Sequence, residues 1–183
     1  DQYTVMCLDA GEESGFRGSY IPFLTALSDQ YIVPLLRFQM GAYSGGTGYN
    51  KYDQMISVYS YSDPNAAETV KVLSEMPDAL EKMELTEEDL NGYILNSLSS
   101  ASGAVGVLSI PFTAIECEIM GVDNQAMADV ANDMKNTSLE DLTSAVEYFK
   151  AAVENASIVT LGNDAVLQRD KEAYDKVISF KDR

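Results

Sequence analysis

Apolar residues near the start of the chain follow first the spacing of a strand and then that of a helix. Gln2–Leu8 is rich in β-prone residues, which predicts a first strand that ends at an acidic turn. Apolar side chains then recur at helical spacing and predict a helix over Ser19–Val33, which Pro34 is expected to end. Leu35–Phe38 fits a short second strand.

A strict alternation follows further along. Within Gln54–Ser62, Ile56 and Val58 fall on one face, and Tyr59 and Tyr61 fall on the other. This alternation predicts a strand that is buried on one face only. The glycine-rich residues 41–48 precede it, and we interpret them as a flexible hairpin connection between two strands.

Helical signals dominate the rest of the chain. Asp63-Pro64 is expected to cap and open a helix that Pro77 kinks or restarts. Capping patterns at Thr86–Asp89 and Ser138–Asp141 predict the starts of two more helices. A last strand is predicted over Ser157–Leu161.

Three further signals lie between the two capping patterns. Residues 99–106 are rich in Ser, Gly and Ala and predict a loop. A helix that Gly121 closes is expected next, followed by one that Asp123 caps.

The order of these elements predicts the fold class. A strand, a helix, two strands, several helices and a last strand favour an α+β domain, with helices packed on one face of an antiparallel or mixed β-sheet. Because domains usually hold about 100–200 residues, we expect residues 1–183 to form a single domain.

Charge and composition narrow the possible partners. The chain has 12 Lys and Arg against 29 Asp and Glu, a formal net charge of −17, and no histidine. Nucleic acids and anionic membrane surfaces attract cationic proteins, so we expect neither as a partner. The missing histidine excludes a Ser-His-Asp triad, a Cys-His pair or a histidine zinc site lying wholly within the chain.

The acidic and sulfur-bearing residues favour structural roles. The clusters Glu12-Glu13, Glu87–Asp89 and Glu140-Asp141 stand where helices begin, so the helix dipole accounts for them and we expect no metal. We interpret Cys7 and Cys117 as buried free thiols, which suit a reducing compartment.

One segment carries candidate chemistry. Arg37 leaves a predicted strand, and Tyr43 follows among glycines, where a backbone approaches a ligand closely. A guanidinium and a phenol together donate hydrogen bonds to a carbonyl oxygen or an oxyanion. The alternative interpretation of this segment is a hairpin connection without a function.

The chain resembles the insulinase (pitrilysin-type) zinc metallopeptidases, in particular their presequence protease and falcilysin branch, whose domains have the LuxS/MPP-like metallopeptidase fold. The resemblance rests on the order and spacing of several stretches. They are Leu35-Leu36-Arg37, Gly41-Ala42-Tyr43, Tyr61-Ser62-Asp63-Pro64-Asn65, Leu85–Leu90, Asn136–Leu142 and Gly162-Asn163.

The resemblance implies a role for the chain in a larger enzyme. In that family two halves close into a chamber around an unstructured peptide, and the first domain supplies the zinc ligands from a His-x-x-Glu-His motif. This chain resembles the last, non-catalytic domain, so its partners would be the peptide and the N-terminal catalytic half of the same polypeptide. The parent would be a zinc metalloendopeptidase, located in the cytoplasm, or in a mitochondrion or plastid of a eukaryote.

The resemblance also assigns the site. Arg37 and Tyr43 would bind the peptide backbone and the oxyanion, and Gly41 and Ala42 would form the loop between them. Met40 and Ser44 replace residues that are commonly glycine in the branch, which affects the shape of the loop. The chain alone is expected to hydrolyse nothing and to bind no zinc. The alternative function is that of an inactive relative that serves as a structural or protein-interaction subunit.

Overall fold

The fold was analysed in a computed structural model, which describes residues 1–101, 110–121 and 124–179. Its strands are β1 (Gln2–Asp9), β2 (Ser44–Asn50), β3 (Met55–Asp63) and β4 (Ser157–Leu161). Its α-helices are α1 (Ile21–Leu27), α2 (Ala67–Ser74), α3 (Met76–Glu81), α4 (Glu87–Ala101), α5 (Ile110–Met120), α6 (Asn124–Lys135), α7 (Asp141–Glu154) and α8 (Asp164–Arg169). The remaining helical segments are η1 (Glu12–Ser14), η2 (Gly18–Tyr20), η3 (Ser28–Ile32), η4 (Pro34–Gln39) and η5 (Lys171–Ala173).

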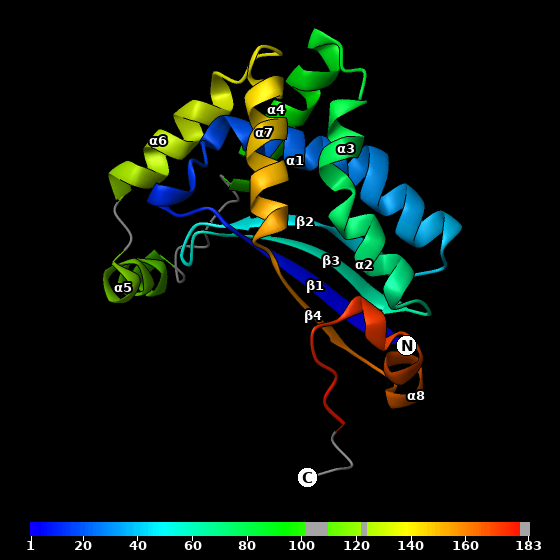
Figure 1. The fold of residues 1–183 in the computed structure, drawn as a ribbon. Helices are drawn as coiled ribbons and strands as arrows, with labels where there is room; N and C mark the ends of the chain where they lie inside the picture. Colours follow the sequence, from blue (N-terminus) through cyan, green and yellow to red (C-terminus); the bar gives the residue numbers. More distant parts are fainter. Residues whose placement is uncertain (102–109, 122–123, 180–183) are drawn as a thin grey trace.

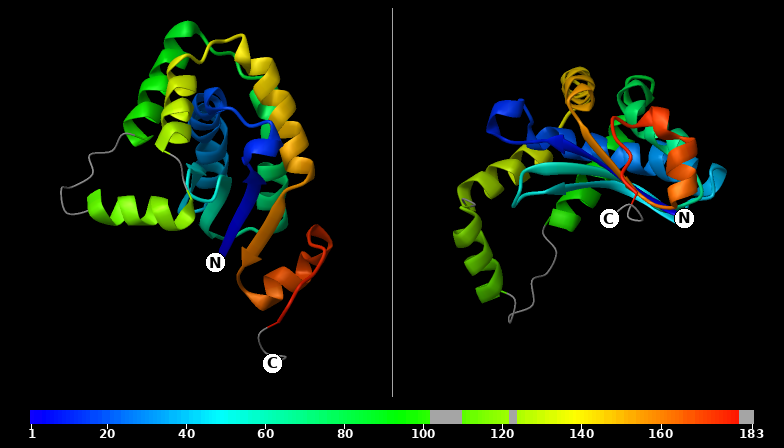
Figure 2. Two further views of the ribbon diagram at one scale, coloured as in Figure 1. Left: turned by 90° about the vertical axis from the view of Figure 1, so that its left-hand side faces the viewer. Right: turned by 60° about the horizontal axis from the view of Figure 1, so that its bottom comes forward.

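The four strands form one sheet in the order β2-β3-β1-β4, and every neighbouring pair is antiparallel. Helices α1 to α4, α6 and α7 lie on one side of this sheet (Figure 1). Helix α5 stands away from the other helices, and α8 lies beyond the end of β4 (Figure 2). The predicted α+β class, with helices on one face, is confirmed.

The core lies between the sheet and these helices. Met6 and Leu8 of β1 and Ile56 and Val58 of β3 are fully buried there, together with Phe23, Leu27 and Phe149 from the helices. The alternate residues of these two strands point to the helix-free face, and Tyr3 of β1 and Tyr61 of β3 are exposed there. The predicted alternation of β3 is therefore confirmed.

The first helical region corrects two predictions. Pro34 does not end the helix, and Leu35–Phe38 is not a strand, because the chain continues as η4 to Gln39. Both η3 and η4 are π-helical, as the Val33 N–H bonded to the Ser28 carbonyl illustrates. In an α-helix, proline cannot donate the bond to the carbonyl four residues earlier, and its ring clashes with that carbonyl. The wider turn of a π-helix does not use this α-type bond and relieves the clash.

The glycine-rich segment is also corrected, because most of it is a strand. β2 pairs with β3 from Ser44 opposite Tyr61 to Asn50 opposite Met55, and residues 51–54 form the turn between them. A Cβ at Gly45 would lie 3.0 Å from Leu36 Cδ1 and 3.1 Å from the Tyr59 carbonyl oxygen. A side chain at position 45 would therefore crowd Leu36 and Tyr59, and glycine lets η4 pack closely against the sheet.

The predicted helix boundaries are mostly confirmed. Thr86 and Asp89 form the reciprocal cap of α4, in which the Asp89 N–H donates to Thr86 Oγ1 over 3.1 Å. The Ser138 N–H donates to Asp141 Oδ2 over 2.9 Å at the start of α7. Pro77 lies in the first turn of α3, just after α2 ends at Ser74.

Other boundary predictions were wrong or fall elsewhere. Asp63 does not cap α2: it is the last residue of β3 and is fully buried. Residues 99–101 belong to α4, and the rest of the predicted loop at 99–106 lies outside the described residues, as does Asp123. Gly121 follows α5 with a φ of 67°, as expected for a residue that closes a helix.

Candidate functional site

The helix-free face of the sheet carries a row of exposed tyrosines. Tyr3 on β1 and Tyr61 on β3 pack edge to face, with ring centroids 4.9 Å apart. Tyr43, just before β2, extends this row, because its ring centroid lies 6.3 Å from that of Tyr61. Tyr43 is 72% exposed and Tyr61 51% exposed, so much of this aromatic surface is open to a ligand.

The loop between η4 and β2 brings the two ends of the predicted site segment together. The Ala42 N–H donates to the Leu36 carbonyl over 2.8 Å, so the residues next to Arg37 and Tyr43 are joined directly. Gly41 has a φ of 86°, in the left-handed region that favours glycine. Ala42 is buried, and its side chain fixes the loop to the body of the domain.

Both candidate donors are available to a ligand. Arg37 is exposed near the end of η4, and its guanidinium lies 5.6 Å from the ring of Phe38, which is itself 73% exposed. Within residues 1–101, 110–121 and 124–179, no carboxylate pairs with Arg37, and no side chain or carbonyl bonds to the Tyr43 hydroxyl.

The two departures from the family pattern fit this loop. The Met40 side chain is half-buried and packs against the core, and its backbone N–H donates to the Leu35 carbonyl over 2.9 Å. Ser44 is the first residue of β2 and pairs with Tyr61. The fold therefore accommodates both residues, Met40 against the core and Ser44 within the sheet.

The described part of the chain does not fit a zinc ion. No group of three or more His, Cys, Asp or Glu residues gathers there into a possible metal site. Cys7 is half-buried and Cys117 buried, and both are free thiols. No described helix is long and apolar enough to cross a membrane.

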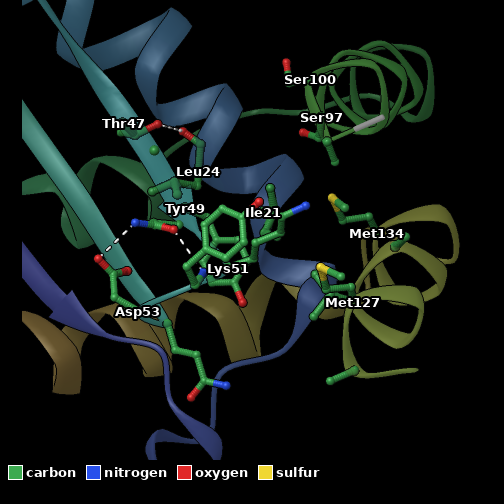
Figure 3. Close-up of a pocket in the computed structure, with 18 of the residues that line it drawn as sticks. Ile21, Leu24, Thr47, Tyr49, Lys51, Asp53, Ser97, Ser100, Met127 and Met134 are labelled. Carbon is green, nitrogen blue, oxygen red and sulfur yellow. Dashed lines mark hydrogen bonds between the residues drawn. The ribbon is translucent and has the colours of Figure 1, made fainter. Parts of the chain in front are cut away.

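A separate groove of about 880 Å³ lies between α1, α4, α6 and the turn that joins β2 to β3 (Figure 3). Met127 and Met134 line one side, and Tyr49 and Lys51 line the other. Burial raises the pKa of the Tyr49 phenol, and the nearby Asp53 adds to this. None of the residues predicted for the site lies in this groove.

The structure adds residues that the sequence interpretation did not assign to the site. Tyr3 and Tyr61 join Tyr43 on the helix-free face, and the alternation of β3 already placed Tyr61 there. Asn65 also contacts the loop, since its side chain donates to the Met40 carbonyl over 2.9 Å. No periodicity predicts this last contact, because it joins a side chain to a backbone oxygen 25 positions away.

Comparisons with known proteins agree with this architecture. The chain is 25% identical over 159 residues to the mitochondrial presequence protease of Kluyveromyces lactis. This match covers 86% of this chain and 16% of that protein. A Bordetella pertussis Tohama I protein classed as a zinc protease matches with a TM-score of 0.67 at 11% identity, over 88% of this chain and 94% of that one. Pitrilysin matches with a TM-score of 0.59 at 9% identity, over 89% of this chain and 19% of that one.

The two structural matches show that this chain shares their fold. Residues 6–163 match the family model of the PreP C-terminal domain, and the chain belongs to this family. It spans about one sixth of the length of its Kluyveromyces lactis relative.

Proposed function

We propose that this domain forms one wall of a peptide-binding chamber in a longer zinc metalloendopeptidase that degrades unstructured peptides. The observation that carries the proposal is the position of Arg37 and Tyr43 at the two ends of one loop. Both side chains are exposed, and within the described residues neither side chain has a hydrogen-bond or ion-pair partner. Tyr43 also contacts Tyr61 on the helix-free face, which is the face that we assign to the wall.

The two side chains act as hydrogen-bond donors. The Arg37 guanidinium binds a backbone carbonyl of the peptide, and the Tyr43 hydroxyl donates to the oxygen that gains negative charge when that carbonyl is attacked. The loop holds both donors before the peptide arrives, so less ordering is needed during the reaction. Gly41 and Ala42 supply the turn and the anchor of this loop.

The zinc of the reaction belongs to another part of the polypeptide, since this chain has no histidine. A division of one site between two halves makes activity depend on their closure, which excludes water from the peptide. The domain alone therefore hydrolyses nothing, and its partners are the catalytic half and the peptide.

The test uses the longer polypeptide and a fluorogenic peptide. Arg37→Met and Tyr43→Phe should each lower kcat by about 10²- to 10³-fold, the loss typical of one oxyanion donor. Arg17→Met and Tyr52→Phe are matched controls, because Arg17 is exposed elsewhere and Tyr52 lies in the turn at the far end of the hairpin. Wild-type rates in both site variants would refute the proposal.

The alternative, an inactive relative that acts as a structural or interaction subunit, makes a different prediction. In that case the longer polypeptide would have a degenerate His-x-x-Glu-His motif and would leave the peptide intact. Sequencing its N-terminal half and assaying the wild-type protein distinguish the two functions.

A further inference from the structure

The turn after β3 is bonded to the candidate loop at two points. The Tyr43 N–H donates to the Ser62 carbonyl over 3.2 Å, next to the exposed phenol. At the other end of the loop, the Asn65 side-chain amide donates to the Met40 carbonyl over 2.9 Å. Residues 62–65 therefore hold both sides of Gly41-Ala42.

The turn that makes these bonds is itself held by a buried carboxylate. Asp63 Oδ2 accepts from Ser60 Oγ over 2.5 Å and from Thr69 Oγ1 over 2.7 Å. Its Oδ1 accepts from the Asn65 backbone N–H over 2.8 Å and from the Asn65 side-chain amide over 3.0 Å. The side-chain amide of Asn65 is thus oriented by Asp63 toward Met40.

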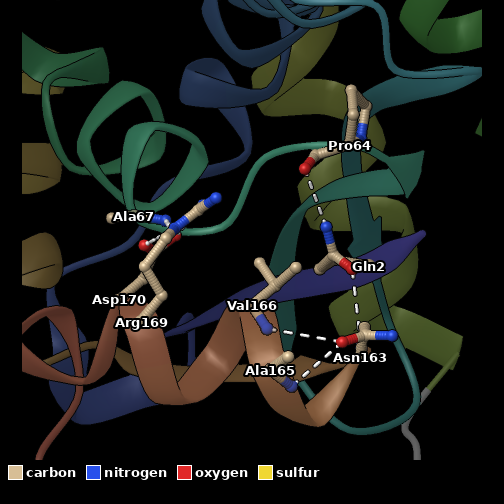
Figure 4. A network of polar contacts seen from close by, with 8 residues as sticks. All are labelled: Gln2, Pro64, Ala67, Asn163, Ala165, Val166, Arg169 and Asp170. Atoms are coloured by element: carbon tan, nitrogen blue, oxygen red, sulfur yellow. Dashed lines mark hydrogen bonds and ion pairs between the residues drawn. The ribbon is translucent and has the colours of Figure 1, made fainter.

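A second anchor comes from β1. Gln2 Nε2 donates to the Asp63 carbonyl over 3.0 Å and to the Pro64 carbonyl over 2.9 Å. Figure 4 shows the bond to Pro64. Gln2 Oε1 also lies 3.5 Å from the Asn163 backbone nitrogen, at the residue whose side chain caps α8. The turn at residues 62–65 is therefore bonded to strand β1 as well as to residues close to it in the sequence.

The backbone of Ser62 is strained at the point of contact. Its φ of 51° lies in the left-handed region, which is unfavourable for a residue with a side chain. Such strain persists only where the surroundings impose it. Here it accompanies the bend that presents the Ser62 carbonyl to Tyr43.

We propose that Asn65, oriented by Asp63, is a positioning residue that holds the Arg37–Tyr43 loop in its productive geometry. The inference rests on the proposed function, because Asn65 would affect catalysis only through the positions of Arg37 and Tyr43. Asn65 does not contact the substrate. Its amide fixes the Met40 carbonyl, and the bond removes freedom from the turn that carries the phenol.

The first test is kinetic and uses the longer polypeptide. Asn65→Ala should lower kcat by about 10- to 100-fold with KM nearly unchanged, because misplacement of a donor affects the transition state more than ground-state binding. Tyr43→Phe should lower kcat by a smaller factor in the Asn65→Ala background than in the wild type, because a misplaced phenol already contributes less to the reaction. Asn155→Ala is the matched control, because Asn155 also bonds a backbone carbonyl through its side-chain amide, at the end of α7.

The second test does not depend on activity. Amide hydrogen exchange in Asn65→Ala should become about tenfold faster at Ala42 and Tyr43, with β3 and α7 unchanged. Asn65→Asp should speed this exchange at least as much as Asn65→Ala, because a carboxylate cannot donate to Met40 and would also lie against the Asp63 carboxylate.

The outcomes separate the two proposals. If Tyr43→Phe lowers kcat but Asn65→Ala leaves kcat and loop exchange at wild-type values, the positioning role is overturned and the proposed function stands. Effects of Asn65 and Tyr43 that simply multiply would also overturn the positioning role. If Arg37→Met and Tyr43→Phe keep wild-type kcat while Asn65→Ala still speeds exchange, the proposed function fails and Asn65 merely holds the loop.

Discussion

The two faces of the sheet are built from the same strands but carry different side chains. Toward the helices, Leu8 and Ile56 are fully buried. Toward the helix-free side, Tyr61, Val159 and Leu161 are each more than half exposed. Because successive strand residues point to opposite faces, one segment supplies both the core and the surface that we assign to a peptide. Substitutions on one face should therefore affect stability, and those on the other should affect binding and turnover.

The largest effect on stability is expected on the covered face. Ile56→Ala should lower the free energy of unfolding by about 2–5 kcal/mol, because it leaves a cavity in a packed core. Leu161→Ala removes a similar side chain from the helix-free face and should cost less than about 1 kcal/mol. Urea denaturation of both variants measures the difference. Equal costs would contradict the division between the two faces.

A smaller effect is expected from two glycines. Gly41→Ala places a side chain at a φ of 86° and should cost about 1–2 kcal/mol. Gly92→Ala should stabilise the domain by about 0.5–1 kcal/mol, because Gly92 lies within α4 and a Cβ there would meet no atom within 4 Å. Thermal unfolding of both variants tests the signs. A stabilising Gly41→Ala would mean that the loop does not need its left-handed turn.

The smallest effect concerns a tyrosine on the covered side. The Tyr148 hydroxyl donates to the Asp9 carbonyl, so Tyr148→Phe should cost about 0.5–1.5 kcal/mol. Tyr61→Phe, on the helix-free face, should change stability by less than about 0.5 kcal/mol. Urea titrations at neutral pH compare the two variants.

The same tyrosine predicts an alkaline dependence. Burial raises the pKa of Tyr148 above its ordinary value of 10.0, and the charge of Asp9 adds to this. A raised folded-state pKa contributes stability that is complete below the unfolded-state pKa and is lost as the pH rises above it. Wild-type stability should therefore fall more steeply above pH 10 than that of Tyr148→Phe. Parallel curves would show that the phenol is not responsible.

Local signals predicted much of the fold. The alternation of Ile56 and Val58 with Tyr59 and Tyr61 gave the correct faces of β3, because one buried face imposes a period of two. The caps at Thr86 and Ser138 were predicted because their bonds join residues three positions apart.

Tertiary contacts decided the elements that were missed. Pro34 normally stops a helix, but π-helical turns accommodate it, and Leu36 on the next turn is fully buried. Glycines normally indicate a loop, but pairing with β3 and the approach of Leu36 to Gly45 make this segment a strand. Helix α8 was not predicted, although the Asn163 side chain that caps it gave a local signal.

The candidate site was predictable in part. The glycine-rich segment itself indicated Arg37 and Tyr43 as candidate donors, and the resemblance assigned their roles. The structure places both residues exposed on one loop, and their roles stay a prediction. The hydrogen bond from the Asn65 side chain to the Met40 carbonyl was not predictable, because it depends on how two segments distant in the sequence pack together.

The most direct test of the central claim is to find which face of the sheet meets the peptide. A photo-crosslinking amino acid is placed at position 61 of the longer protein, on the helix-free face, or at Leu95, which is 68% exposed on α4. After illumination with a bound peptide, we predict a peptide adduct at position 61 and none at position 95. An adduct at position 95 alone, or equal yields at both positions, would contradict the account.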